Sequence, residues 1–352
     1  MTTAILFQGK TGEADLKHSL DQLSKTKNIN WLLIGNAAPA GLSLKLEFVS
    51  CNSCSLPQVL ATALEKTSDS SLIFIDAACP PSPSAIEALS SNLPGNVNIL
   101  PLKVTSPLPA WTEPSAAALA PLLASGTTWP LCAVAVSKET LSLKSFTAAS
   151  PLEAMVQIII QNIGLGKKPR LMKEPADSCL SPESCKLSVQ ATARCLQLAV
   201  DSCNIETLFP DHPWGKHQQE SAAASYHSLA AMFLKLEDLN ACSECLRLAD
   251  KFEDSPRSLA LKGMLAARRS EVLGAVANMI ASLQLYEQRK RNDDGSHYLC
   301  FNPADIEAVN KDLATGLSAL NQQDNSTALQ HFTAAVFDFD SFFKEHGLSQ
   351  II

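Results

Sequence analysis

The sequence predicts an α/β N-terminal domain followed by an all-α domain built from helical repeats. Two observations lead to this prediction. In the first half, short apolar runs alternate with amphipathic helical patterns, as in a mostly parallel sheet flanked by helices. In the second half, helical patterns recur with small residues 34 positions apart. A chain of 352 residues is long enough for two domains.

Four strands and three helices are expected before residue 95. The strands lie at 3–7, 31–34, 44–49 and 72–75, and the helices at 13–25, 56–66 and 84–93. Residues 72–75 are four apolar residues in a row, which is typical of a strand buried on both faces. That strand ends at Asp76, and the prolines that follow prevent further ladder pairing.

Three further strands are expected at 99–104, 133–137 and 167–172, the last at a sheet edge, with helices at 115–124 and 152–162. Residues 173–184 contain Pro175 and Pro182 and few apolar residues, which indicates a linker. The predicted organisation is therefore a sheet domain at 1–172, a linker at 173–184 and a helical domain at 185–352.

Composition excludes several classes of protein. The chain is 46% hydrophobic and 18% charged, which is typical of a folded protein. Its net charge of -7 argues against a nucleic-acid binder. The start lacks the features of a signal peptide, and no apolar run approaches the roughly 20 residues of a membrane helix. We expect a soluble, cytoplasmic protein with no membrane span.

Eleven cysteines are scattered along the chain, and we expect them to be reduced core residues. Cys51/Cys54 and Cys242/Cys245 have the spacing of zinc ligands, but a site shared by the two pairs is disfavoured because they fall in different predicted domains. Cys51 and Cys54 alone would suit a redox pair without opening a thioredoxin-like helix. His212 and His217 are five residues apart, and we favour solvated loop histidines over metal ligands there.

The helical half contains a repeat. Ala241 and Ala275 occupy the same place in two helical pairs, 34 residues apart, which is the tetratricopeptide period. A third copy fits residues 313–336, with Ala328 in that place after an insertion around 289–303. Each pair needs a small residue where its helices cross. A final helix at 337–343 is expected to cap the array.

Residues 1–172 resemble a GT-A glycosyltransferase domain of the family 2 type in the order and spacing of their features. Residues 31–41 (Trp-Leu-Leu-Ile-Gly-Asn-Ala-Ala-Pro-Ala-Gly) resemble the family's apolar strand followed by Asp-Asn-Gly-Ser-x-Asp-Gly. Residues 71–80 resemble the strand that delivers the Asp-x-Asp motif. Residues 133–139 resemble the strand behind the acceptor site, and 152–166 the helix that opens with Glu-Asp and closes with Gly. The resemblance covers about half of the chain.

The resemblance implies an enzyme that binds a nucleotide-sugar through a divalent metal, but this sequence departs from the motifs. The metal-binding Asp corresponds to Ala78, the uracil-side Asp to Gly35 and the second acid of that loop to Ala40. The general base falls on Ala154 of the pair Glu153-Ala154. Alanine and glycine neither bind metal nor accept a proton, so the resemblance implies a domain without its catalytic groups.

Asp76 and Glu153 are the carboxylates that remain. Their functional interpretation makes Asp76 a metal or nucleotide ligand, together with Asn36, and Glu153 a base. Their structural interpretation makes Asp76 the cap of a turn and places Glu153 in a first helical turn, where the helix dipole favours its charge. We favour the structural interpretation, with no metal and no catalytic residue, because one carboxylate makes a poor magnesium site.

We therefore predict a non-catalytic, glycosyltransferase-like scaffold or adaptor without a cofactor. Its helical repeats would bind a protein partner, such as an active glycosyltransferase, the polypeptide acceptor or a second copy of the chain. The first alternative is an active hexosyltransferase that uses a UDP- or GDP-sugar with Mn or Mg and acts on a protein. The second is a structural subunit whose old cleft is filled, as Ala37, Ala38, Ala77 and Ala78 would suit.

Overall fold

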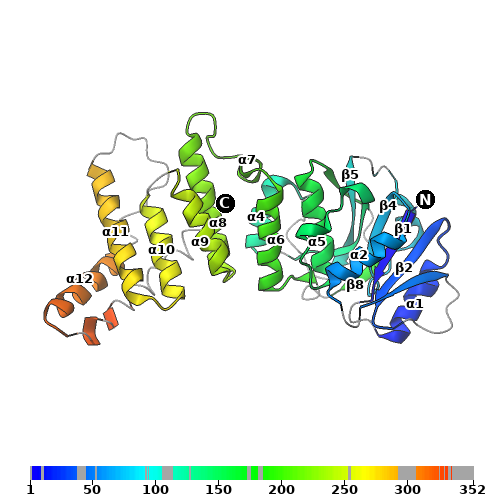
Figure 1. Cartoon of the computed structure of the whole chain (residues 1–352), viewed down its shortest axis with the longest axis horizontal. Coiled ribbons are helices and arrows are strands. Elements are labelled where there is room, and N and C mark those ends of the chain that lie inside the picture. Colours follow the sequence, from blue (N-terminus) through cyan, green and yellow to red (C-terminus); the bar gives the residue numbers. More distant parts are fainter. Residues whose placement is uncertain are drawn as a thin grey trace. The chain divides into compact units, whose positions relative to one another are not determined.

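The computed structural model divides the chain into two compact units, Met1–Leu208 and Phe209–Ile352 (Figure 1). The structure describes all residues except 1, 9–11, 38–44, 52–53, 92, 94, 105–113, 127, 173–175, 181–184, 253–254, 292–306, 325, 329, 332–333 and 335–352. The insertion predicted at 289–303 lies mostly outside the described residues, and the helix predicted at 337–343 lies wholly outside them.

The first unit is built on one mixed sheet. Its strands are β1 (Thr2–Phe7), β2 (Ile29–Gly35), β3 (Leu46–Ser50), β4 (Ser71–Asp76), β5 (Asn96–Val104), β6 (Leu131–Ser137), β7 (Lys168–Leu171) and β8 (Ala176–Leu180). The strand order is β3-β2-β1-β4-β6-β5-β7, and β8 pairs with β5. Strand β6 runs antiparallel to β4 and β5, whereas the other pairs are parallel. The predicted mostly parallel α/β fold is confirmed.

Helices cover both faces of this sheet, which explains why its strands are apolar on both sides. The helices along the sheet are α1 (Glu13–Leu23), α2 (Leu56–Lys66), α3 (Pro83–Leu89), α4 (Ala116–Ala124) and α5 (Pro151–Gly164). On one face, α1 and α3 join a single buried cluster with alternate strand residues such as Leu6, Leu33 and Ile75. The opposite face, with the stacked rings of Phe7 and Phe74, is covered by α2 and α5.

A further helix, α6 (Val189–Ser202), packs against α4 and α5 and so belongs to the first unit (Figure 1). Because α6 covers the outer side of α5, every residue of α5 from Glu153 to Ile163 is buried. Gly164 permits the close approach, since an added Cβ would lie 2.6 Å from the carbonyl oxygen of Ser202. Gly164 thus serves packing, and Gly166, with φ +75°, ends the helix as expected.

The division between the units therefore differs from the expected one. The predicted linker at 173–184 contains strand β8, and the first helix assigned to the helical domain lies in the sheet unit. A short helix, α7 (Ile205–Leu208), ends that unit. The amphipathic pattern of α6 was recognised, but a pattern alone does not indicate which surface the apolar stripe covers.

The second unit contains helices α8 (Gln218–Lys235), α9 (Leu239–Ala249), α10 (Pro256–Arg268), α11 (Val272–Arg291) and α12 (Glu307–Asn321). Helices α8 and α9 pack together as a hairpin, and so do α10 and α11 (Figure 1). None of the described helices in the chain is both long and apolar enough to span a membrane.

Three turns in the described part of this unit have the same geometry. Each contains a left-handed residue, namely Glu237, Ser270 and Gln323, with φ of 60°, 62° and 62°. The residue that follows each of these donates its N–H to a carbonyl five positions back, with N···O distances of 3.0, 2.9 and 3.0 Å, as in a Schellman motif. The turns lie 33 and then 53 residues apart.

The small residues at the helix crossings follow the same spacing, which corrects one prediction. The first helices contribute Ala230, Gly263 and Gly316, and the second helices contribute Cys242, Ala275 and Ala328, all of them buried. An added Cβ at Gly263 would lie 3.1 Å from the carbonyl oxygen of Ala275. The anchor of the first hairpin is therefore Cys242 rather than Ala241, and the observed period is 33 residues rather than 34.

Candidate functional site

The carboxyl ends of four parallel strands meet at one edge of the sheet and bring polar residues together there. Gln8 follows β1, Asn36 follows β2, Cys51 follows β3, and Asp76 ends β4. Phe7 lies opposite Ile34 in one neighbouring strand and opposite Asp76 in the other. Asn36 and Asp76 thus lie at the same edge with β1 between them, which is where open α/β sheets bind ligands.

Asp76 is a half-buried carboxylate with local contacts. Its Oδ1 accepts a hydrogen bond from the N–H of Ala78 at 3.0 Å, and its carbonyl oxygen accepts one from the N–H of Cys79 at 3.0 Å. Burial raises the pKa of Asp76, and the hydrogen bond from Ala78 lowers it by less. A side-chain bond two residues along the chain forms an Asx turn, as the structural interpretation expected.

The surroundings of Asp76 do not fit a divalent cation. Hard cations bind several oxygen ligands, whereas Asp76 is followed by Ala77 and Ala78, which offer no side-chain oxygen. In the part of the chain that the structure describes, no group of three or more His, Cys, Asp or Glu residues is placed to hold a metal ion. Asp76 alone does not supply an octahedral magnesium site.

Three cysteines lie in the core behind Asp76. Cys79, Cys132 and Cys185 are at most 1% exposed, and the thiol of Cys132 donates to the carbonyl oxygen of Cys79 at 2.7 Å. Burial, with a smaller contribution from the charge of Asp76, raises the pKa of Cys79 to about 12. These thiols are protonated at neutral pH, and they behave as small core residues and not as nucleophiles.

Gly35, the last residue of β2, is packed against Gln8. An added Cβ would lie 2.0 Å from Oε1 and 3.0 Å from Cβ of Gln8. Oε1 of Gln8 accepts a hydrogen bond from the N–H of Asn36 at 3.0 Å, and Oδ1 of Asn36 accepts one from the thiol of Cys51 at 3.1 Å. The side chain of Gln8 thus lies where a larger residue at position 35 would project. Ala40 lies outside the described residues.

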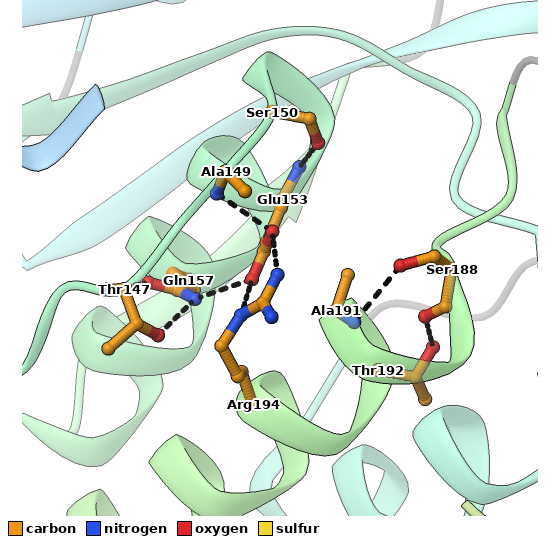
Figure 2. Close-up of polar contacts among 9 residues, drawn as sticks. All are labelled: Thr147, Ala149, Ser150, Glu153, Gln157, Ser188, Ala191, Thr192 and Arg194. Atoms are coloured by element: carbon orange, nitrogen blue, oxygen red, sulfur yellow. Dashed lines mark hydrogen bonds and ion pairs between the residues drawn. The ribbon is translucent and has the colours of Figure 1, made fainter. Parts of the chain in front are cut away.

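Glu153 is held by four hydrogen bonds from the first unit itself (Figure 2). Its side chain is 1% exposed and forms a bidentate ion pair with Arg194 of α6, at 2.7 Å from Nε to Oε1 and 2.8 Å from Nη2 to Oε2. Oε1 also accepts from Nε2 of Gln157 at 3.2 Å, and Oε2 from the N–H of Ala149 at 2.9 Å. The N–H of Glu153 donates to Ser150, which caps α5.

The row of polar residues that starts at Glu153 fixes the segment between β6 and α5. Gln157 accepts from the N–H of Thr147 at 3.0 Å, and Gln161 donates to the carbonyl oxygen of Ser142 at 2.7 Å. Residues 153, 157 and 161 lie on one side of a helix because they are four apart. This side of α5 therefore binds its own preceding loop.

Arg194 is the residue at this site that the sequence did not indicate. It is 41 positions from Glu153 in the chain and was assigned to the other domain. The hydrogen bond with Glu153 raises the pKa of Arg194, so the ion pair is formed at neutral pH. The sequence shows Arg194 as a charged residue among the apolar positions of an amphipathic helix, but this pattern does not indicate that its partner is Glu153.

The remaining candidate residues have separate surroundings. Cys54 directly precedes Ser55, the N-cap of α2, so the Cys51/Cys54 pair lies before this helix and does not open it. Cys242 and Cys245 are buried in α9, where burial raises the pKa of each thiol to about 12. His212 contacts the hydroxyl of Ser225 at 3.0 Å, and His217 lies 3.7 Å from Glu220.

Solved structures that are similar to this chain share little of its sequence. Residues 1–349 of TarS from S. aureus match with a TM-score of 0.43 at 10% identity, over 86% of this chain and 97% of that one. The mannosyltransferase PcManGT from Pyrobaculum calidifontis, solved with GDP-Man and Mn2+, matches with a TM-score of 0.33 at 12% identity, over 97% of this chain and 86% of that one. No family model and no curated protein matches the sequence.

Proposed function

We propose that the chain is a non-catalytic, glycosyltransferase-like scaffold or adaptor whose helical repeats bind a protein partner. The observation that supports this most directly is the environment of Glu153. A general base needs a free lone pair directed at the proton it removes. Glu153 is 1% exposed, and both of its oxygens accept hydrogen bonds from the unit that contains it.

Two further observations support the loss of catalysis. The position of the metal-binding Asp is Ala78, and Asp76 is engaged in a turn with that same residue. The position of the uracil-side Asp is Gly35, where Gln8 fills the adjoining space. In this resemblance Ala78 and Gly35 replace the metal-binding and uracil-side acids, and Glu153, the acid beside the position of the expected base, is already bonded within the chain.

The glycosyltransferase-like part of the proposal is supported by the order of the sequence features and by the fold. The first unit has the helix-flanked, mostly parallel sheet that this resemblance implies. The strand expected behind an acceptor site is present as β6, and the helix that follows it is α5.

The partner-binding part of the proposal is supported by the repeats. Stacked helical hairpins present an extended surface on which a helix or an extended peptide binds. Partners that fit the proposal are an active glycosyltransferase, the polypeptide that such an enzyme modifies, or a second copy of this chain.

Isothermal titration calorimetry of the full chain tests the catalytic question first. UDP- and GDP-sugars would be titrated in turn, with and without Mn2+, into the wild type, Asp76→Ala and Glu153→Gln. We expect no binding heat from any donor. Metal-dependent binding in the micromolar range that Asp76→Ala abolishes would refute the proposal and establish the active hexosyltransferase. Metal-independent binding that neither substitution alters would place a nucleotide elsewhere and leave the loss of catalysis standing.

A further inference from the structure

Arg257 is a buried cation in the second unit. It occupies the second position of α10, directly after Pro256, and the residue is only 8% exposed. The described residues offer its guanidinium no hydrogen bond and no ion pair. Burial lowers the pKa of Arg257 to about 10, so it still carries its charge at neutral pH. A buried charge without a partner costs several kcal/mol, on the order of the stability of a small domain.

Asp250, the acid whose charge raises the pKa of His227, is already paired within the second unit. Oδ2 of Asp250 pairs with Nζ of Lys262 at 2.7 Å, and Oδ1 accepts a hydrogen bond from the hydroxyl of Ser258 at 2.6 Å. The charges that Asp250 and Lys262 bring therefore balance each other. Neither compensates the guanidinium of Arg257.

The groups around Arg257 offer mainly donors, and Asp211, the acid whose charge raises the pKa of His212, is an exposed residue. Ser255, the N-cap of α10 and two positions before Arg257, lies beside His227, and the charge of Arg257 lowers the pKa of both His227 and His212. His227, buried on α8, has a pKa of about 3 and is neutral. Its Nε2 lies 3.5 Å from the hydroxyl of Ser255, the N-cap of α10. The hydroxyl of Ser221, whose carbonyl contacts His212, is buried and has no partner in the described part of the chain.

We infer that Arg257, His227 and Ser255 form a binding site for an oxyanion, a phosphate or carboxylate group, where α8 meets α10. We call these three residues the Arg257 site. A guanidinium binds two oxygens of such a group at once through parallel N–H donors. The N-terminus of α10 adds its positive dipole end, which favours an anion at the same place.

This site goes beyond the proposed function, because it assigns a ligand chemistry to the repeats whether or not the first unit is catalytic. It joins the first helices of two successive hairpins, α8 and α10, so a bound oxyanion would link two repeats. The oxyanion can come from a free ion or from an acidic side chain of a bound protein. Free ions of both kinds separate a phosphate from a carboxylate requirement.

The test measures hydrogen exchange of the α8 and α10 peptides in the full chain, first without polyvalent anions and then with inorganic phosphate, sulfate or acetate. At ten times the dissociation constant, a bound anion raises the folded-to-unfolded ratio about elevenfold, which slows exchange by the same factor. We expect this in the wild type and its loss in Arg257→Met. Arg247→Met, which removes an exposed arginine of α9, is the matched control and should respond like the wild type.

The order of stability of the wild type and Arg257→Met should also reverse between buffer without polyvalent anions and buffer with phosphate. Without anions, Arg257→Met is expected to be at least as stable as the wild type because it removes an uncompensated buried charge. With phosphate, the wild type should become the more stable protein. Histidine NMR adds a local measurement: phosphate should raise the pKa of His227 and shift its ring resonances, while the ring resonances of His331, which pairs with Asp312, should not respond to phosphate.

Two outcomes would overturn the inference. The first is the absence of any effect of phosphate, sulfate and acetate on exchange and on His227. The second is a loss of stability in Arg257→Met without anions that the double substitution Glu253→Gln/Asp254→Asn reproduces. Those two acids precede α10 in the sequence and lie outside the described residues. Such a result would mean that the chain itself compensates the guanidinium.

Discussion

The ion pair between Glu153 and Arg194 gives the sharpest prediction, because its two members differ in exposure. Glu153 is 1% exposed, whereas the side chain of Arg194 is 36% exposed. In Arg194→Met the carboxylate stays buried without its counter-charge. In Glu153→Gln the guanidinium turns to water and stays solvated. The two substitutions are therefore expected to have unequal costs.

The magnitude follows from this geometry. Removing one partner of a fully buried ion pair costs about 3–5 kcal/mol. Partial exposure of Arg194 screens the pair, and the N–H of Ala149 and Nε2 of Gln157 still donate to the carboxylate. We therefore expect Arg194→Met to cost about 2–3 kcal/mol, and Glu153→Gln about 1–2 kcal/mol through weakened hydrogen bonds. The double variant should cost no more than Arg194→Met alone.

Urea unfolding of the full chain, followed by tryptophan fluorescence, measures these differences. Trp31 and Trp129 are buried in the first unit, and a Trp214→Phe background removes the tryptophan of the second unit. A double-mutant cycle then gives the coupling energy of the pair. Additive costs, or a smaller cost for Arg194→Met than for Glu153→Gln, would show that Arg194 does not hold Glu153. The proposed loss of catalysis would then lack its main support.

Three further predictions concern packing and pH. Gly164→Ala should destabilise the first unit by about 2 kcal/mol, because the new Cβ would lie 2.6 Å from the backbone of α6. Gly263→Ala, whose nearest contacts lie at 3.1 Å, should change the stability of the second unit by less than about 1 kcal/mol, because the gain in helix propensity offsets the contact. The urea midpoints of the two variants and the wild type measure both effects. The second unit should lose about 2 kcal/mol between pH 8 and 5. The unfolded chain protonates His227 near pH 6.5, but the folded chain does so only near pH 3, so stability falls as pH falls through that window, and His227→Gln should flatten the slope. Asp76→Asn should leave the melting temperature at pH 7 unchanged or higher, since burial raises the pKa of this carboxyl and the cost of its charge disappears as pH falls through the folded pKa; a lower melting temperature would show a favourable contact of the charged form.

The elements of the sheet could be predicted because each strand is written in local sequence. The run at 72–75 is apolar on both faces, and the structure covers both faces with helices. Strand β8 was missed for a physical reason. It lies in a stretch with few apolar residues and pairs with β5 beyond a register shift at Leu102/Lys103, so its pairing depends on a partner about 70 residues away.

The small residues of the helical half predict where its helices cross, but the predicted position in the first hairpin is wrong by one residue. Ala241 and Cys242 are neighbours, and both are small enough for a helix crossing. Only the turn geometry, with Glu237 and Ser270 in the left-handed conformation, shows that Cys242 corresponds to Ala275. Cys242, one of the two cysteines with zinc-like spacing at 242 and 245, is thereby explained as a small residue at a helix crossing.

Asp76 and Glu153 differ in the number of acceptor positions that remain free on their carboxylates. A carboxylate offers about four acceptor positions, two on each oxygen. Each oxygen of Glu153 accepts two hydrogen bonds, so a proton can reach it only if a bond to Arg194, Gln157 or Ala149 breaks first. Oδ1 of Asp76 accepts one hydrogen bond, from the backbone N–H of Ala78. Burial raises the pKa of Asp76 by more than this hydrogen bond lowers it. Of these two carboxylates, Asp76 is the one with acceptor positions that no contact in the described part of the chain fills, which is why Asp76→Ala, and not Glu153→Gln, decides between a scaffold and an enzyme.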